Sequence, residues 1–181
     1  MHAATTPQQT SGPVLPWMLH PDELAALYDY WLRQDPESEV PLWHALDKDE
    51  VAPWLGSLFI LRFPSPASDE IVPGGVGRKI MQRLGFDPRD LKPDHPTRLF
   101  MEESYLQARQ ERRPTYSENE FRRPGSGVPV PYTRLALPYR NKEDVVDRLL
   151  CGIYFLAPGT RVDSRTVVLE RTAPERPATA S

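Results

Sequence analysis

The sequence predicts one α+β domain, in which a five-stranded antiparallel sheet carries helices on its concave face. Three observations predict it. The apolar pattern is helical near the N-terminus. It then alternates between strand-like and helical segments, and it ends in three strand-like segments. A length of 181 residues is enough for one well-buried core and short for two.

The first element is an amphipathic helix that is expected from residue 21 to the proline at position 36. Its apolar residues recur at i, i+3, i+4, i+7 and i+8, and they are Leu24, Leu27, Tyr28, Trp31 and Leu32. Such a stripe suits a dimerisation or docking helix, and it equally suits a helix that covers the chain's own core. The pattern leaves both uses open.

The middle of the chain predicts two strands, which are followed by a group of helices. The second strand is expected to be short and bent, because Pro73, Gly74 and Gly75 interrupt it. A short helical turn is expected before the first strand, and about one further turn between the last two helices. The strands are expected at 57–63 and 71–76, and the helices at 78–84 and 97–113.

The last third predicts a meander of three strands, at 116–121, 130–139 and 145–156. The two ends are rich in Ala, Thr, Pro and Ser and bury too little apolar surface to order themselves. We therefore expect a disordered tail over 1–19, a domain over 20–160 and a mostly flexible tail over 161–181.

Composition limits the classes of partner. The net charge of −3 provides no field that would attract nucleic acid. No apolar run approaches the roughly 20 residues that cross a bilayer, and the N-terminus lacks the apolar core of a signal peptide. Cys151 is the only cysteine, so no internal disulfide can form. These features predict a cytoplasmic protein without a membrane span.

Several segments together resemble a family of bacterial single-domain PAS proteins. They include LYDYWL (27–32), VPLW (40–43), WLGSLFIL (54–61), GRKIMQRLGFDPRD (77–90) and the closing hairpin YTRLALPYRNKEDVVDRLLCGIYF (132–155). The resemblance covers about 24–155 and rests on the order and spacing of these segments. It departs at 71–77, where IVPGGVG replaces an arginine-bearing strand. The resemblance implies a PAS-like sheet that cups its helices and holds a ligand between them.

The resemblance further implies a non-catalytic sensory or regulatory domain in bacterial signalling. Such a domain binds a small apolar ligand, a signalling protein, or both, and forms a homodimer in some arrangements. Strand alternation and helix position suggest the pocket residues, which are Met81, Leu84, Leu99, Phe100, Leu135, Leu137, Ile153 and Phe155. In the alternative interpretation, these residues fill the core.

Other motifs favour ordinary structural roles. The glycines at 74, 75 and 77 fit neither phosphate-binding fingerprint. His95 lacks a second metal ligand at a recognisable spacing, and Cys151 is expected in a buried strand. We assign no cofactor, metal site or catalytic residue. Two other functions stay open: a ligand-free dimerising adaptor, and a small hydrolase or isomerase, which would need a convergent acid–base group.

Overall fold

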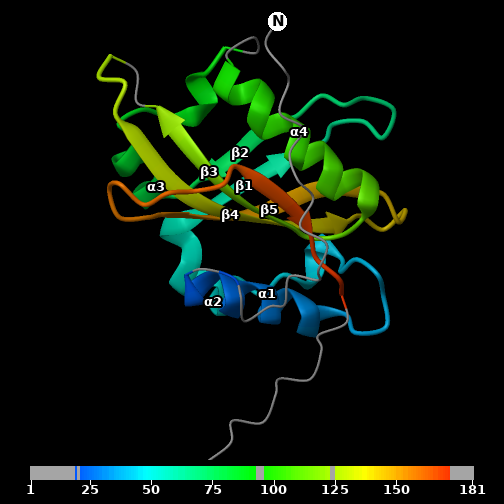
Figure 1. The fold of residues 1–181 in the computed structure, drawn as a ribbon. Helices are drawn as coiled ribbons and strands as arrows, with labels where there is room; N and C mark the ends of the chain where they lie inside the picture. Colours follow the sequence, from blue (N-terminus) through cyan, green and yellow to red (C-terminus); the bar gives the residue numbers. More distant parts are fainter. Residues whose placement is uncertain (1–18, 20, 93–95, 123–124, 172–181) are drawn as a thin grey trace, which may run out of the picture.

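The computed structural model describes residues 19, 21–92, 96–122 and 125–171, except the side chains of residues 96, 97 and 99–101. The described residues form an open, antiparallel six-stranded sheet with helices on both faces (Figure 1). Its strand order is β2-β1-β5-β4-β3-β6. The strands are β1 (Leu58–Arg62), β2 (Val72–Val76), β3 (Thr115–Arg122), β4 (Pro129–Arg140), β5 (Val146–Phe155) and β6 (Arg165–Val168).

Four α-helices pack on this sheet. They are α1 (Asp22–Gln34), α2 (Lys48–Val51), α3 (Arg78–Leu84) and α4 (Pro96–Glu111). Short 3-10 turns form at Trp43–Ala45, Ala52–Ser57 and Pro88–Asp90. The helix and strand order that the sequence predicts is confirmed for these elements, including a short turn before β1 and another between α3 and α4.

The sheet has one strand more than the sequence predicts. Residues 165–168, which lie in the segment that we expected to be mostly flexible, form β6 and pair antiparallel with β3. Leu169 follows at 1% exposure. A four-residue strand gives too few alternations to be distinguished from a polar tail, so the prediction of five strands was wrong by this edge strand.

The two faces of the sheet carry separate apolar clusters. One cluster gathers around α1, and the other lies beneath α3 and α4. These helices lie on opposite faces of the sheet (Figure 1). Nearly every residue of β4 is buried, since alternate residues enter opposite clusters. A strand that is covered on both faces shows a near-continuous apolar run, so its sequence does not reveal which residue faces which layer.

Helix α1 is held by contacts from both the sheet and the segment after β6. Trp31 Nε1 donates to the Pro138 carbonyl oxygen at 2.9 Å. Tyr28 donates from its hydroxyl to the Glu170 carbonyl oxygen, and the Arg171 guanidinium lies 4.9 Å from the Trp31 ring centroid. The chain beyond the predicted domain end at residue 160 therefore packs on the first helix.

The bent second strand is confirmed. Phe59 pairs with Val76 and Leu61 pairs with Pro73, so β2 has one extra residue between the two pairs. This shift is a β-bulge at the Pro-Gly-Gly interruption. Directly afterwards, Gly77 precedes the first residue of α3 and donates from its backbone nitrogen to the Leu58 carbonyl oxygen at 2.7 Å.

Most of the predicted tails, over 1–18 and 172–181, lies outside the described residues. Leu19, which we placed in the first tail, is fully buried in the α1 cluster. Among the described residues, no helix has the length and the apolar character that a membrane span requires.

Candidate functional site

A small apolar pocket lies between the sheet and the segment from α3 to residue 91. Its volume is about 30 Å³, which leaves room for a few atoms rather than for a large ligand. Half of its lining is aromatic. The lining residues are Phe59, Ile80, Leu84, Phe86, Pro88, Leu91, Phe121, Tyr132, Ile153 and Phe155.

Strand register and helix periodicity position this lining. Tyr132 lies opposite Phe155 in the β4–β5 pair, and their ring centroids are 6.1 Å apart. Ile80 and Leu84 are one turn apart on α3, so both reach the same side. Gly85 then ends α3 in the left-handed conformation, with φ of 81°, and this turn directs the following residues across the pocket.

A second cavity of about 30 Å³ adjoins the first. The two share Phe59, Pro88 and Leu91, so the 3-10 turn at Pro88–Asp90 separates them. The second cavity is also lined by Tyr105 and Arg98.

A polar group is buried beside these cavities. The Arg134 side chain projects from β4 toward α4 and is 1% exposed. It donates from Nη2 to Ser104 Oγ, and its guanidinium lies 4.5 Å from the Tyr105 ring centroid. Its Nη1 has no hydrogen-bond partner among the described residues. Arg134 is thus the one fully buried cation in the described core.

Burial keeps the ionisable neighbours of Arg134 uncharged. Desolvation raises the pKa of the Tyr105 and Tyr132 hydroxyls above their ordinary value. Burial also raises the pKa of the Cys151 thiol to about 12. Each group therefore stays protonated at neutral pH, and none of them supplies a negative charge to the guanidinium.

The structure brings together part of the predicted pocket. Leu84, Ile153 and Phe155 line it. Met81, although half-buried on α3, does not. Leu99 and Phe100 belong to α4, but their side chains lie outside the described part of the chain.

The assignment of Leu135 and Leu137 to this pocket was wrong. Both are fully buried in the α1 cluster, on the opposite face of the sheet. Leu135 pairs with Gly152 and Arg134 pairs with Ile153, so Tyr132, Arg134 and Ala136 lie on the other face of β4 from Leu135, and of these Tyr132 lines the pocket. A one-residue difference in phase exchanges the faces of a whole strand.

The predicted interaction helix faces inward. Leu24, Leu27, Tyr28 and Trp31 are fully buried in the chain's own α1 cluster, and Leu32 packs against it. Of the two uses that the pattern left open, the structure places this stripe over the chain's own core. These side chains are therefore not accessible to a partner in this structure.

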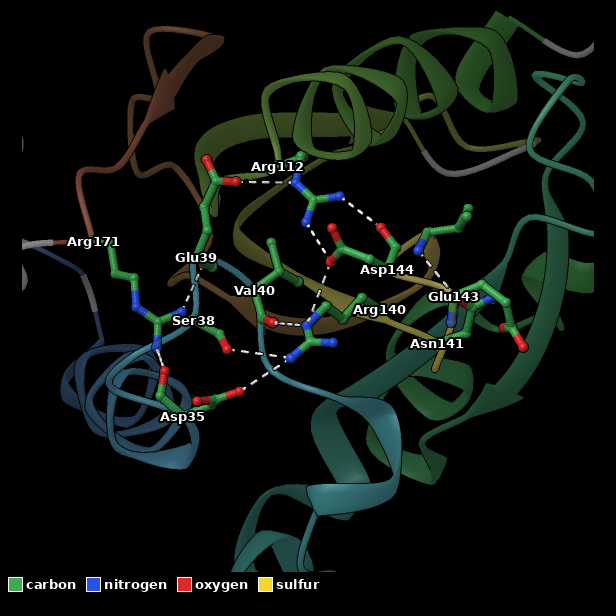
Figure 2. Close-up of polar contacts among 11 residues, drawn as sticks. Asp35, Ser38, Glu39, Val40, Arg112, Arg140, Asn141, Glu143, Asp144 and Arg171 are labelled. Atoms are coloured by element: carbon green, nitrogen blue, oxygen red, sulfur yellow. Dashed lines mark hydrogen bonds and ion pairs between the residues drawn. The ribbon is translucent and has the colours of Figure 1, made fainter.

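A polar cluster at one end of the sheet connects the loop after α1 to β4 (Figure 2). Arg140 donates from Nε to the Val40 carbonyl oxygen at 2.7 Å and from Nη2 to Asp35 Oδ2 at 3.3 Å. Hydrogen bonds from Ser38, with the charge and hydrogen bond of Arg140, lower the pKa of the Asp35 carboxyl.

Arg112 and Arg171 extend this cluster to the end of α4 and to the C-terminal segment (Figure 2). Arg112 donates to the Asp144 backbone and carboxylate oxygens, both at 2.9 Å, and to Glu39 Oε2 at 3.0 Å. Arg171 donates to the Glu39 carbonyl oxygen at 2.6 Å. Each of these cations donates to carbonyl or carboxylate oxygens of other segments, so the cluster joins those segments.

Metal-binding groups do not assemble in the part of the chain that the structure describes, where no three His, Cys, Asp or Glu side chains come together. His95 lies outside that part.

Comparison of the chain with protein-family models, with curated proteins and with solved structures finds no match in any of the three.

The sequence interpretation missed most of the pocket. Ile80 was recoverable, because it shares a helix face with Leu84. The sequence does not identify Phe59, Phe121 and Tyr132 as lining residues. When a strand is buried on both faces, its neighbours decide which residues face which side. The sequence analysis assigned no role to Arg134, which the structure buries.

Proposed function

We propose that this chain is a PAS-type sensory or regulatory domain of bacterial signalling, which binds a small apolar ligand between its sheet and helices α3 and α4. The observation that carries the proposal is the aromatic pocket at that position. Apolar clefts with a few polar groups are the usual form of small-molecule sites. Binding would act on signalling by favouring one conformation over another, without catalysis.

The order of the elements supports the PAS-type fold. Strands β1 and β2 precede α3 and α4, and the antiparallel strands β3, β4 and β5 follow them. All five belong to one sheet. The aromatic pocket lies on the face that these helices cover, where a sheet that cups its helices would hold a ligand. A cytoplasmic location is part of the same proposal.

Native mass spectrometry of freshly purified protein tests this function. We expect one ligand per chain, seen as a mass increment that is lost on denaturation. Leu84→Trp should abolish the increment by filling the edge of the pocket, whereas Val128→Trp should retain it, because Val128 is 54% exposed and outside the pocket. Circular dichroism checks that both variants fold.

A ligand-free adaptor is the second candidate function. The observation that favours it is the small pocket volume of about 30 Å³, as expected where side chains fill an interior. An adaptor predicts the mass of the bare chain in every variant, together with a dimer whose fraction rises with concentration. That result in the same experiment would contradict the ligand-binding proposal.

A further inference from the structure

The guanidinium of Arg134 is a buried charge that has no counterion among the described residues. The ionisable groups that influence its charge are Tyr105, Tyr132 and Cys151, and burial raises the pKa of all three, so they stay protonated at neutral pH. Among the described residues no carboxylate forms an ion pair with it, and its Nη1 donates no hydrogen bond. The contacts it does make are with Ser104 and the Tyr105 ring.

A lone cation in a protein interior is costly. Arginine cannot escape the cost by losing its proton, because its pKa lies far above neutral pH. A ring contact and one hydroxyl hydrogen bond replace only part of the lost hydration. A carboxylate is the group that compensates a guanidinium best, because its two oxygens accept two parallel N–H donors.

Arg134 lines neither cavity, but its neighbours line both. Its cross-strand neighbour Ile153 and the preceding pocket-facing residue of β4, Tyr132, both line the aromatic cavity. The ring over its guanidinium, Tyr105, lines the second cavity. A ligand whose apolar part occupies these cavities would therefore bring an attached acidic group close to the guanidinium.

We propose that the ligand is a small apolar carboxylate, whose carboxylate group pairs with Arg134 while its hydrocarbon part lies in the aromatic cavity. This inference rests on the proposed function and names the class of ligand. The two cavities are small and share the Pro88–Asp90 turn as a partition. Binding therefore includes a displacement of this turn, which joins the cavities.

Isothermal titration calorimetry with two matched probes tests the role of the charge. Benzoate carries the carboxylate, and benzyl alcohol has nearly the same shape without it. We expect benzoate to bind at least tenfold more tightly to the wild-type protein. This preference should disappear in Arg134→Met and persist in Arg122→Met, because the Arg122 side chain is 71% exposed and paired with Glu120.

Stability in the absence of ligand separates a binding role from a structural one. Replacing a buried, unpaired charge by an apolar side chain of similar length is often neutral or stabilising. We expect Arg134→Met to melt at the same temperature as the ligand-free wild type or at a higher one. Arg134→Lys keeps the charge but loses the two-donor geometry, so we expect benzoate to bind it at least tenfold more weakly.

The outcomes distinguish the two proposals. Equal binding of benzoate and benzyl alcohol would overturn the role of Arg134 and leave an apolar ligand site in place. An unchanged preference for benzoate in Arg134→Met would also overturn it. If native mass spectrometry finds a bound molecule while neither probe binds, the ligand function stands and the carboxylate assignment falls.

Discussion

Gly77 is a residue at which a single added carbon atom should be poorly tolerated. A Cβ there would lie 2.3 Å from the Gly56 carbonyl oxygen, a backbone atom that cannot rotate away. We expect Gly77→Ala to lower the free energy of unfolding by about 3 kcal/mol, as overpacking does. Urea denaturation measures it.

Gly75 supplies the matched control, because it lies on β2, two residues before Gly77. A Cβ there would meet Ile60 Cδ1 at 3.6 Å, which is an ordinary contact. We expect Gly75→Ala to change stability by less than about 0.5 kcal/mol. Equal effects of the two alanines would contradict the close approach of Gly77 to Gly56.

The Cys151 thiol should be inert in the folded protein. It is fully buried, and burial raises its pKa to about 12, so almost no thiolate exists at pH 8. We expect a thiol reagent such as Ellman's reagent to label the native protein slowly and the urea-unfolded protein at once. Rapid stoichiometric labelling of the native protein would show that the cluster beneath α4 is open.

Asp147 should make the fold more stable in acid. Desolvation raises the pKa of its carboxyl above the ordinary value, although the Arg148 charge opposes this. The folded state thus binds the proton more tightly than the unfolded chain, and this contribution is lost as the pH rises through the folded pKa.

Asp147→Asn should therefore raise the melting temperature slightly at pH 7, and this gain should shrink toward pH 3. Hydrogen bonds from Arg89 lower the pKa of the Asp87 carboxyl, so Asp87→Asn should show the opposite sign at pH 7. Melting curves of both variants against pH check the two signs. A gain for Asp147→Asn that grows on acidification would contradict the assignment.

At the scale of elements, α1 is part of the folded core. Leu27 is fully buried between this helix and the sheet, and Gly152 permits the approach, since a Cβ there would lie 2.8 Å from Leu27 Cδ2. We expect Leu27→Ala to cost about 2–5 kcal/mol in urea denaturation.

Leu55 is the control for this prediction, because 56% of it is exposed. We expect Leu55→Ala to change stability by less than about 0.5 kcal/mol. If Leu27→Ala were equally mild, α1 would be free to leave the sheet, and its apolar stripe would again be available to a partner.

Element order was predictable from sequence because each long element has a strong local signal. The stripe of α1 and the Pro-Gly-Gly bend of β2 are examples. The facing of β4 was not predictable, since Leu135 and Arg134 are both buried, in different clusters. Strand β6 was missed because its position is set by pairing with β3 and not by its own four residues.

At the scale of the whole molecule, the two covered faces of the sheet differ in structure. The α1 face is closed by large side chains and by the C-terminal segment. The α3–α4 face contains the two small cavities and the Arg134 guanidinium, which has no counterion among the described residues. We therefore expect a ligand to affect one face of the sheet and leave the other unchanged.

Methyl-resolved NMR with added benzoate tests this claim most directly. The account predicts saturable shifts of Ile80, Leu84 and Ile153, which line the aromatic cavity, while Leu27 and Leu137 on the α1 face stay in place. The largest shifts at Leu27 and Leu137, or no shift of any methyl group at millimolar benzoate, would contradict it.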